Sequence, residues 1–413
     1  MKVGMCTVRI GAAVAAVAIA GFTGGCSQPL RKLDDATLTK MAAEDDARFA
    51  AEYGEAVDRV MNRVSARLET GSDPVMDILA ISGGGDWGAF GSGFLVGWKN
   101  APGELKRPDF DVVTGVSTGA LISPFAFVGS DEAFETVLNF YRNPKPDWVS
   151  TRGLFFFGPW NPSFATIPGL RRDLTGVIDQ SFAEKMAAQS NEGKLLLVSA
   201  SNLDRSRQRF WYMGPLAVEA ARTGNLEEIH KRLLASSAIP VVFPPVEIDG
   251  FLYGDGGVTA NVLLRLEPHA KHGFIQTWMR KYPGKRLPKV RYWIIINNQI
   301  QPPAGPVQQK WTTILSPALA MSIRSGTMAE VRWLAAEAMY VNAEFDADIE
   351  VRTVSIPNDW RPPVEGSFQR ETMNSLADIG LRMGSDPASW MLWCEKRMSN
   401  TKAAEASVVP QGN

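Results

Sequence analysis

The spacing of hydrophobic and polar residues changes sharply about seventy residues into the chain. Residues 29–73 place apolar side chains such as Leu38 and Met41 at helical intervals among charged ones, which predicts one or two amphipathic helices. Residues 71–74 interrupt that pattern with Gly and Pro. From Met76 the apolar residues become consecutive and a glycine-rich turn follows at once, which is typical of a buried strand leading through a loop into a helix.

The same unit then recurs. Residues 110–114 predict a second strand, a tight turn follows, and a helix interrupted by Pro124 begins at Ala120. Two successive strand–turn–helix units indicate an α/β fold with an at least partly parallel sheet, and residues 246–253 predict a strand pair that reverses at a Asp-Gly turn. Further strands are predicted over 194–199, 210–212, 291–296 and 349–354, and helices over 226–238, 316–343 and 368–383.

Two segments lack regular spacing. Residues 143–170 are rich in Pro, Gly, Trp and Phe, which predicts an ordered loop or lid whose aromatic side chains pack among themselves rather than against lipid. Residues 401–413 predict a frayed tail.

The beginning of the chain has the features of an export signal. Lys2 and Arg9 precede an apolar run over residues 10–22 that is short for a membrane span, so we expect a signal peptide. The sequence around Cys26 resembles the lipobox of bacterial lipoproteins, although Thr23 stands where those boxes usually carry leucine. That resemblance implies lipidation of Cys26 and a membrane-anchored lipoprotein of the bacterial cell envelope. The alternatives are ordinary cleavage, giving a periplasmic or secreted protein, and an uncleaved anchor.

Composition narrows the class of protein. The 413 residues are 45% hydrophobic, which suffices for a large core, and 43 basic against 44 acidic residues leave no electrostatic footprint for a nucleic acid. Neutral or amphipathic partners are expected. Three cysteines exclude a disulfide framework and leave Cys394 as the ordinary thiol. No Cys/His cluster has metal-ligand spacing, so neither a metal nor a cofactor is predicted.

Ser117 is the strongest candidate for a chemical role. It lies in a Gly-x-Ser-x-Gly run, flanked by Gly115 and Gly119, between a predicted strand and a predicted helix. Glycines on both sides permit the strained turn that lifts a nucleophilic hydroxyl out of a sheet, and the N–H groups at the start of the following helix favour negative charge. We therefore expect Ser117 to be the acylating nucleophile of a lipid- or ester-cleaving hydrolase.

Two further elements would complete such a site. Gly83, Gly84 and Gly85 form a turn whose backbone N–H groups could hold an oxyanion. With Gly88 the spacing also fits a dinucleotide-binding loop, which is a rival interpretation. Asp255 is bracketed by glycines and would ordinarily be a turn residue, but in a dry site its carboxylate could take the serine proton directly.

Together these elements resemble the patatin-like phospholipase family. Its oxyanion loop corresponds to 83–88, its nucleophile elbow to 115–119, and its Asp-Gly-Gly motif to Asp255, Gly256 and Gly257. The run 235–240, Ala-Ser-Ser-Ala-Ile-Pro, matches a further family motif. Trp87 departs from the family, which usually has Arg or Lys there, and this puts in doubt a cation that binds substrate phosphate.

The resemblance covers about residues 76–385. It implies a three-layer α/β fold, with a mostly parallel central sheet flanked by helices, and a lipid acyl hydrolase that uses a Ser117–Asp255 dyad. The expected organisation is a signal peptide over 1–26, a helical extension over 27–75, the hydrolase domain over 76–385, and a C-terminal helix and tail over 386–413.

Only three histidines, His230, His269 and His272, could support a different mechanism. In a Ser-acid-His order, His269 or His272 could complete a triad of the α/β-hydrolase type. They lie in a polar stretch with loop character, which favours the dyad. A further alternative is a catalytically silent lipoprotein that binds lipids or partners on the same scaffold.

Overall fold

One mixed sheet forms the centre of the molecule in the computed structural model, which describes residues 33–69, 74–153, 161–264 and 274–395. Its strand order in the described residues is β11-β10-β9-β1-β2-β5-β8-β7, with β6 paired to β5. The parallel strands are β1 (Val75–Ile81), β2 (Val112–Val116), β5 (Leu195–Asn202), β9 (Lys289–Gln299) and β10 (Asp348–Ile356). The antiparallel strands are β6 (Arg207–Tyr212), β7 (Val246–Ile248), β8 (Phe251–Asp255) and β11 (Met391–Cys394).

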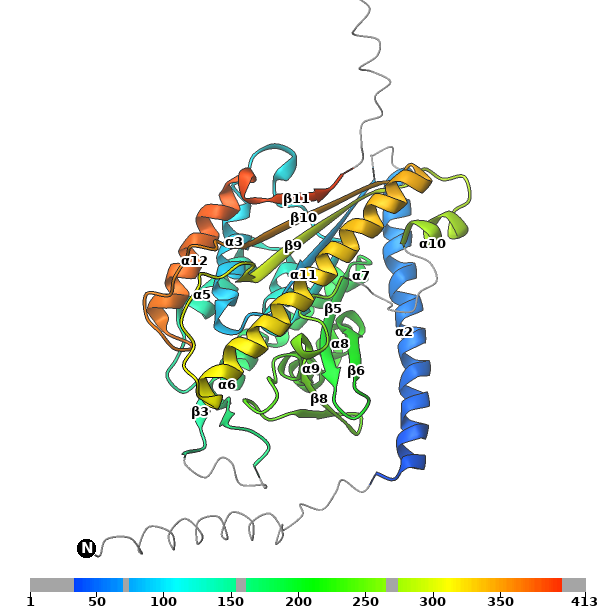
Figure 1. The fold of residues 1–413 in the computed structure, drawn as a ribbon. Coiled ribbons are helices and arrows are strands. Elements are labelled where there is room, and N and C mark those ends of the chain that lie inside the picture. Colours follow the sequence, from blue (N-terminus) through cyan, green and yellow to red (C-terminus); the bar gives the residue numbers. More distant parts are fainter. Residues whose placement is uncertain (1–32, 70–73, 154–160, 265–273, 396–413) are drawn as a thin grey trace, which may run out of the picture.

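Helices cover both faces of this sheet (Figure 1). Along β1 the buried side chains alternate between two cores, because Leu79 and Ile81 pack on one face while Ile78 and Ala80 pack on the other. The first face carries α3 (Gly88–Trp98), α4 (Thr118–Val128), α5 (Asp131–Arg142), α6 (Pro168–Val177), α7 (Gln180–Asn191), α8 (Met213–Thr223), α9 (Glu227–Ser236) and α12 (Arg370–Ser385). The second carries α2 (Asp35–Glu69), α10 (Phe274–Lys281) and α11 (Trp311–Phe345). This is the expected three-layer α/β architecture.

Short elements complete the description. The 3-10 helices are η1 (Gly85–Trp87), η2 (Gly103–Leu105), η4 (Gly256–Val258) and η5 (Pro387–Ser389), and a two-stranded sheet pairs β3 (Ser150–Thr151) with β4 (Ala165–Thr166).

The amphipathic segment before the sheet is a single long helix, α2, which packs against the second face. Its apolar side includes Val60 and Val64 in the core, and its charged side forms ion pairs with the sheet. Asp45, although buried, pairs with Arg205 at 3.0 Å and with Arg209 at 3.3 Å. Burial of an apolar stripe together with paired charges explains why the helix lies on the domain.

The end of the described chain differs from expectation. Instead of a C-terminal helix from residue 386, the chain forms the one-turn helix η5 and then β11, which pairs antiparallel with β10. Cys394 is buried at the end of this strand. The short apolar run Met391–Cys394 pairs with the edge of the sheet formed by β10. Four residues are too few to show the alternation of a strand in the sequence.

Candidate active site

Ser117 lies in a tight turn between the carboxyl end of β2 and the start of α4. Its backbone has φ 54° and ψ −123°, a conformation that costs about 1–3 kcal/mol for a residue other than glycine and that recurs at functional sites. The turn also requires close approach: a Cβ on Gly119 would collide with the carbonyl oxygen of Ile81, and one on Gly115 with the carbonyl of Gly119. The Gly-x-Ser-x-Gly spacing therefore has a steric reason in this fold.

The Ser117 hydroxyl donates a hydrogen bond of 2.6 Å to Oδ2 of Asp255, the last residue of β8. The other carboxylate oxygen accepts the N–H of Gly257 at 2.7 Å. Burial raises the pKa of Asp255 to about 6, against the opposing effect of these two hydrogen bonds. The structure thus brings together the serine and the carboxylate that the sequence singles out, and the pKa of that carboxyl makes it a stronger base than an ordinary aspartate.

The run 235–240 holds both members of this pair in place. Ser236 Oγ accepts the N–H of Ser117 at 2.9 Å and donates to the carbonyl of Ser199 at 2.5 Å. The carbonyl of Ala238 accepts the N–H of Asp255 at 2.7 Å. The sequence motif indicates that this run contributes to the site. That Ser236 fixes the backbone of the nucleophile was not expected, because this role depends on a hydrogen bond between residues distant in the sequence.

The glycine loop lies directly against the nucleophile, since a Cβ on Gly83 would come within 3.0 Å of the Ser117 Cβ. Its donors are not equivalent. The N–H of Gly83 donates to the carbonyl of Asn261 at 3.0 Å, so the expected oxyanion role does not fit this glycine. In the part of the chain that the structure describes, no acceptor is recorded for the N–H groups of Gly84 and Gly85. These two remain the candidate oxyanion donors.

Two asparagines at the end of β9 fix the orientation of that loop. Asn297 Nδ2 donates to the carbonyl of Ser82 at 2.9 Å, and Asn298 Nδ2 donates to the carbonyl of Gly83 at 3.0 Å. Gly84 packs on the backbone of Asn297 so closely that a Cβ would collide with its carbonyl oxygen. Because these contacts occupy the loop carbonyls, the free N–H groups are held without backbone reorganisation. The only signal in the sequence was the position of both asparagines at the carboxyl end of a predicted strand.

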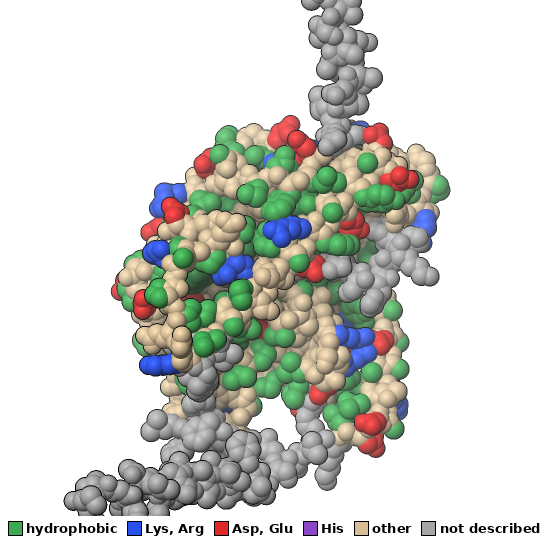
Figure 2. Space-filling view, in the orientation of Figure 1, with side chains coloured by type: hydrophobic (Ala, Val, Ile, Leu, Met, Phe, Trp, Pro, Cys, Tyr) green, Lys and Arg blue, Asp and Glu red, His purple; other side chains and the backbone are tan. Residues whose placement is uncertain are grey.

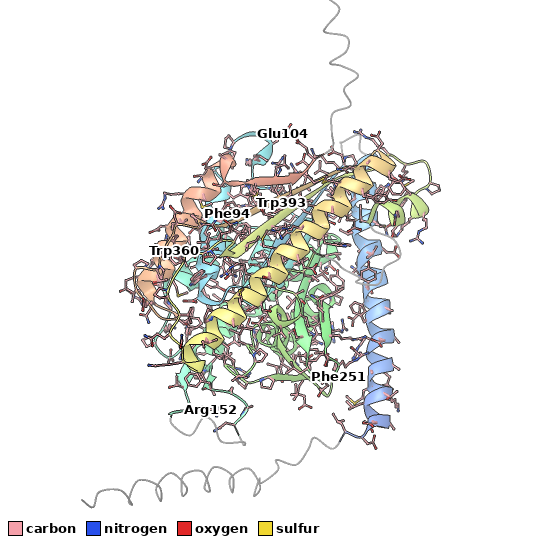
Figure 3. The ribbon with its side chains drawn as sticks, in the orientation of Figure 1. Phe94, Glu104, Arg152, Phe251, Trp360 and Trp393 are labelled. Carbon is pink, nitrogen blue, oxygen red and sulfur yellow. The ribbon has the colours of Figure 1, made fainter. Side chains whose placement is uncertain are left out.

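The remaining motif glycines are positions of close packing. A Cβ on Gly88 would collide with Thr118 Oγ1, and one on Gly256 would come within 2.5 Å of the Ser199 carbonyl. Trp87, where the family has a cation, packs edge-to-face on Trp360, with 5.2 Å between ring centroids; Figure 3 labels Trp360.

The histidines do not enter the described site. The ring Nε2 of His230, on α9, lies 2.8 Å from the carbonyl oxygen of Ile178 and donates to it. His269 and His272 lie outside the described residues, as does Cys26. Within the described ranges, no group of three or more metal-ligating side chains is present, and no helix is both long and apolar enough to span a membrane.

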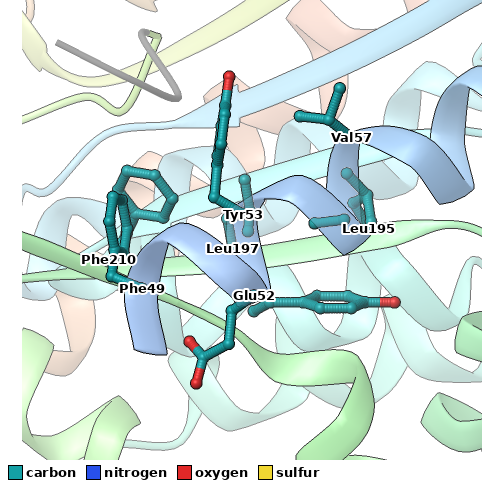
Figure 4. A pocket seen from close by; sticks show the side chains of 9 residues that line it. Phe49, Glu52, Tyr53, Val57, Leu195, Leu197 and Phe210 are labelled. Carbon is teal, nitrogen blue, oxygen red and sulfur yellow. The ribbon is translucent and has the colours of Figure 1, made fainter. Parts of the chain in front are cut away.

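A small apolar pocket lies elsewhere, between α2 and strands β5 and β6 (Figure 4). Phe49, Tyr53 and Leu197 are among its lining residues, and neither Ser117 nor Asp255 borders it. It is an imperfection in the packing of α2 on the sheet rather than a part of the candidate site.

Comparisons with known proteins place this geometry in a family. Residues 79–266 match the family model described as patatin-like phospholipase, and this range contains the glycine loop, Ser117 and Asp255. No curated protein matches the sequence. Among solved structures, the crystal structure of VipD from Legionella pneumophila is similar over 77% of this chain and 67% of that chain, with 11% sequence identity and a TM-score of 0.35. Residues 79–266, a little under half of the chain, therefore match the patatin-like phospholipase family, a family of lipid acyl hydrolases.

Proposed function

We propose that the protein is a serine acyl-ester hydrolase in which Ser117 is the nucleophile and Asp255 is its only base. The observation that carries this proposal is the direct 2.6 Å hydrogen bond from the Ser117 hydroxyl to a buried carboxylate. A serine in a strained turn, bonded to a carboxylate whose pKa is raised to about 6, has both the nucleophilic oxygen and the proton acceptor that acyl transfer needs.

The reaction follows from these positions. Asp255 takes the proton of the Ser117 hydroxyl while the oxygen attacks an ester carbonyl, and the N–H groups of Gly84 and Gly85 stabilise the resulting oxyanion. The intermediate collapses to an acyl-serine as Asp255 returns the proton to the departing alkoxide. A water molecule then gives a proton to Asp255 and attacks the acyl group. As this second intermediate collapses, Asp255 passes the proton to the departing Ser117 oxygen, which releases the fatty acid and restores both residues. The start of α4 adds a favourable dipole for the developing negative charge.

The glycine loop supports this function over nucleotide binding. Gly83 lies against the Ser117 side chain, and the loop carbonyls are bonded to Asn297 and Asn298. A dinucleotide would need the same N–H groups for its phosphates, whereas here the loop that carries them packs against a nucleophile.

The pH dependence of the reaction tests the assigned base. Because protonated Asp255 cannot accept the serine proton, we expect kcat/KM for a water-soluble ester to be constant above the pKa of about 6 and to fall roughly tenfold for each pH unit below it. A pH–rate profile checks this. Activity that persists unchanged to about pH 5, where an ordinary aspartate is still mostly ionised, would contradict the assignment.

We also propose that Cys26 carries a lipid that anchors the protein in the bacterial cell envelope, on the basis of the apolar run and the lipobox-like residues that precede it. We expect a radioactive fatty acid supplied to cells to label the wild-type chain and to leave the Cys26→Ala variant unlabelled. Equal labelling of the two chains, or no labelling of either, would rule out the lipidation.

A further inference from the structure

Helix α11 is longer than the sheet on which it packs. It ends at Phe345, and β10 starts at Asp348 and runs back along it, so the two elements meet at the amino edge of the parallel strands. Its 35 residues span roughly 50 Å, whereas the nine residues of β10 span roughly 30 Å. The first half of α11 must therefore extend past the carboxyl edge of the sheet, where Ser117 lies.

A hydrogen bond fixes where the helix passes the site. Asn261 Nδ2 donates to Thr327 Oγ1 of α11 at 3.1 Å, and the carbonyl of the same asparagine accepts the N–H of Gly83 from the oxyanion loop. Thr327 is buried. The residues of α11 that precede it, 311–326, form a segment that we call the α11 overhang.

The α11 overhang exposes large apolar side chains. Ile314, Leu319 and Met321 are 48%, 45% and 61% exposed. Figure 2 shows hydrophobic side chains along the diagonal that α11 follows across this face of the molecule. Apolar residues gathered on one projecting helix, where polar ones would cost nothing, mark an interaction surface.

The apolar surface continues around the candidate site. Val258 follows the Asp-Gly-Gly motif in η4 and is 55% exposed, and Val241, which follows the run 235–240, is 73% exposed. Val241 has a φ of 69°, a strained conformation for a β-branched residue. The backbone N–H of the exposed Phe164 donates to the carbonyl of Val241. Exposed apolar side chains thus flank the residues that hold Asp255.

Within two sequence ranges that contribute to this surface, the charged residues all have one sign. The sequence has no Asp or Glu between residues 292 and 329 or between 148 and 172. Cations are present in these ranges. Arg324 belongs to the α11 overhang, Lys310 immediately precedes it, and Arg152 lies in the 143–170 loop. Arg152 is exposed and lies at the same end of the molecule as the start of α11 (Figure 3). Exposed apolar side chains beside cations on these segments are complementary to an anionic lipid surface.

We propose that the α11 overhang docks this end of the molecule on a lipid bilayer that contains anionic headgroups. Leu319 and Met321 enter the acyl region, Arg152 and Arg324 face the headgroups, and the Ser117 site faces the membrane. This inference specifies how the lipid substrate of the proposed function is reached, and the surface can be tested separately from the chemistry.

The test places a fluorophore on the overhang of the full-length chain. The protein carries Ser117→Ala, Cys6→Ser and Cys26→Ala, so that neither turnover nor an acyl chain contributes, and Cys394 is buried. An environment-sensitive dye is attached to Met321→Cys or, as the matched control, to Met339→Cys, which is 54% exposed near the other end of α11. With vesicles of phosphatidylcholine and phosphatidylglycerol, we expect the emission of the dye at position 321 to rise and shift to the blue, and that at position 339 to stay unchanged.

Charge insertion provides a second measurement. Leu319→Glu with Met321→Glu should weaken binding to these vesicles about tenfold or more, because each glutamate removes apolar burial and repels the anionic surface. Met339→Glu with Tyr340→Glu, equal in charge, should not. The proposal would be overturned if the dye at position 321 did not respond to vesicles, or if the dye at position 339 responded equally. It would also be overturned if the emission at position 321 changed with protein concentration in the absence of vesicles, because a second copy of the chain would then be the occupant. None of these outcomes depends on ester hydrolysis.

Discussion

Replacing Asp255 by Asn is expected to lower kcat for ester hydrolysis roughly ten-thousand-fold while leaving the protein folded. The amide can keep both hydrogen bonds that the carboxylate makes, since its oxygen can accept the N–H of Gly257 and its nitrogen can meet the Ser117 oxygen. What it cannot do is accept the serine proton. The fall in kcat therefore reports the loss of the catalytic base and not a change in the structure of the turn.

The same variant should gain stability at alkaline pH. Folding raises the pKa of Asp255 from 3.8 to about 6, so its carboxylate is disfavoured in the fold. The stability that protonated Asp255 contributes is complete below the pKa of the unfolded chain and is lost as the pH rises through the pKa of the folded protein. The penalty above about pH 6 corresponds to roughly 3 kcal/mol, which Asn avoids because it does not titrate. Thermal unfolding should show Asp255→Asn more stable than wild type near pH 8, with the advantage gone near pH 4.

Asp86→Asn is the matched control for buried charge. Asp86 is also buried, burial raises its pKa, and it accepts the backbone N–H of Phe368 at 2.8 Å rather than a bond from Ser117. It should show the same kind of stability gain at high pH, and because Asp255 remains as the base, its loss of activity should be far smaller than that of Asp255→Asn. If Asp255→Asn retained activity close to wild type, Asp255 would be a structural residue and the dyad would be wrong.

The position of the nucleophile and of the central strands could be predicted because local sequence determines them. The turn around Ser117 needs glycines at fixed spacing, and the apolar runs of β1, β2 and β9 are buried on both faces, so spacing alone identifies them. The helical pattern before the sheet likewise corresponds to α2. In each case the sequence signal and the structural cause lie within a few consecutive residues.

Features that depend on contacts between distant segments could not be predicted. Which glycine N–H groups stay free is decided by Asn261, 178 residues after Gly83 in the chain, whose carbonyl occupies the N–H of Gly83. Ser236 has the same spacing as any helical serine, and only the fold places it against the Ser117 backbone. The strand β11 was missed because four residues carry too little periodicity.

The proposed docking surface on α11 could not be predicted for a related reason. In the sequence, the aromatic residues of the 143–170 loop are conspicuous candidates for lipid contact, whereas the exposed apolar residues belong to a helix whose spacing predicts burial. Their exposure follows from the length of α11 relative to β10, a comparison that requires the packing of the two elements.

Labelling with a fluorophosphonate probe, followed by peptide mass spectrometry, tests the central claim most directly. A phosphonate reacts with an activated serine and mimics the tetrahedral intermediate, so we expect a single adduct on the peptide that contains Ser117. The adduct should be absent in Ser117→Ala and retained when His269 and His272 are both replaced by Ala. An adduct on another serine, no adduct on folded wild-type protein, or loss of the adduct in the double histidine variant would contradict a Ser117–Asp255 dyad.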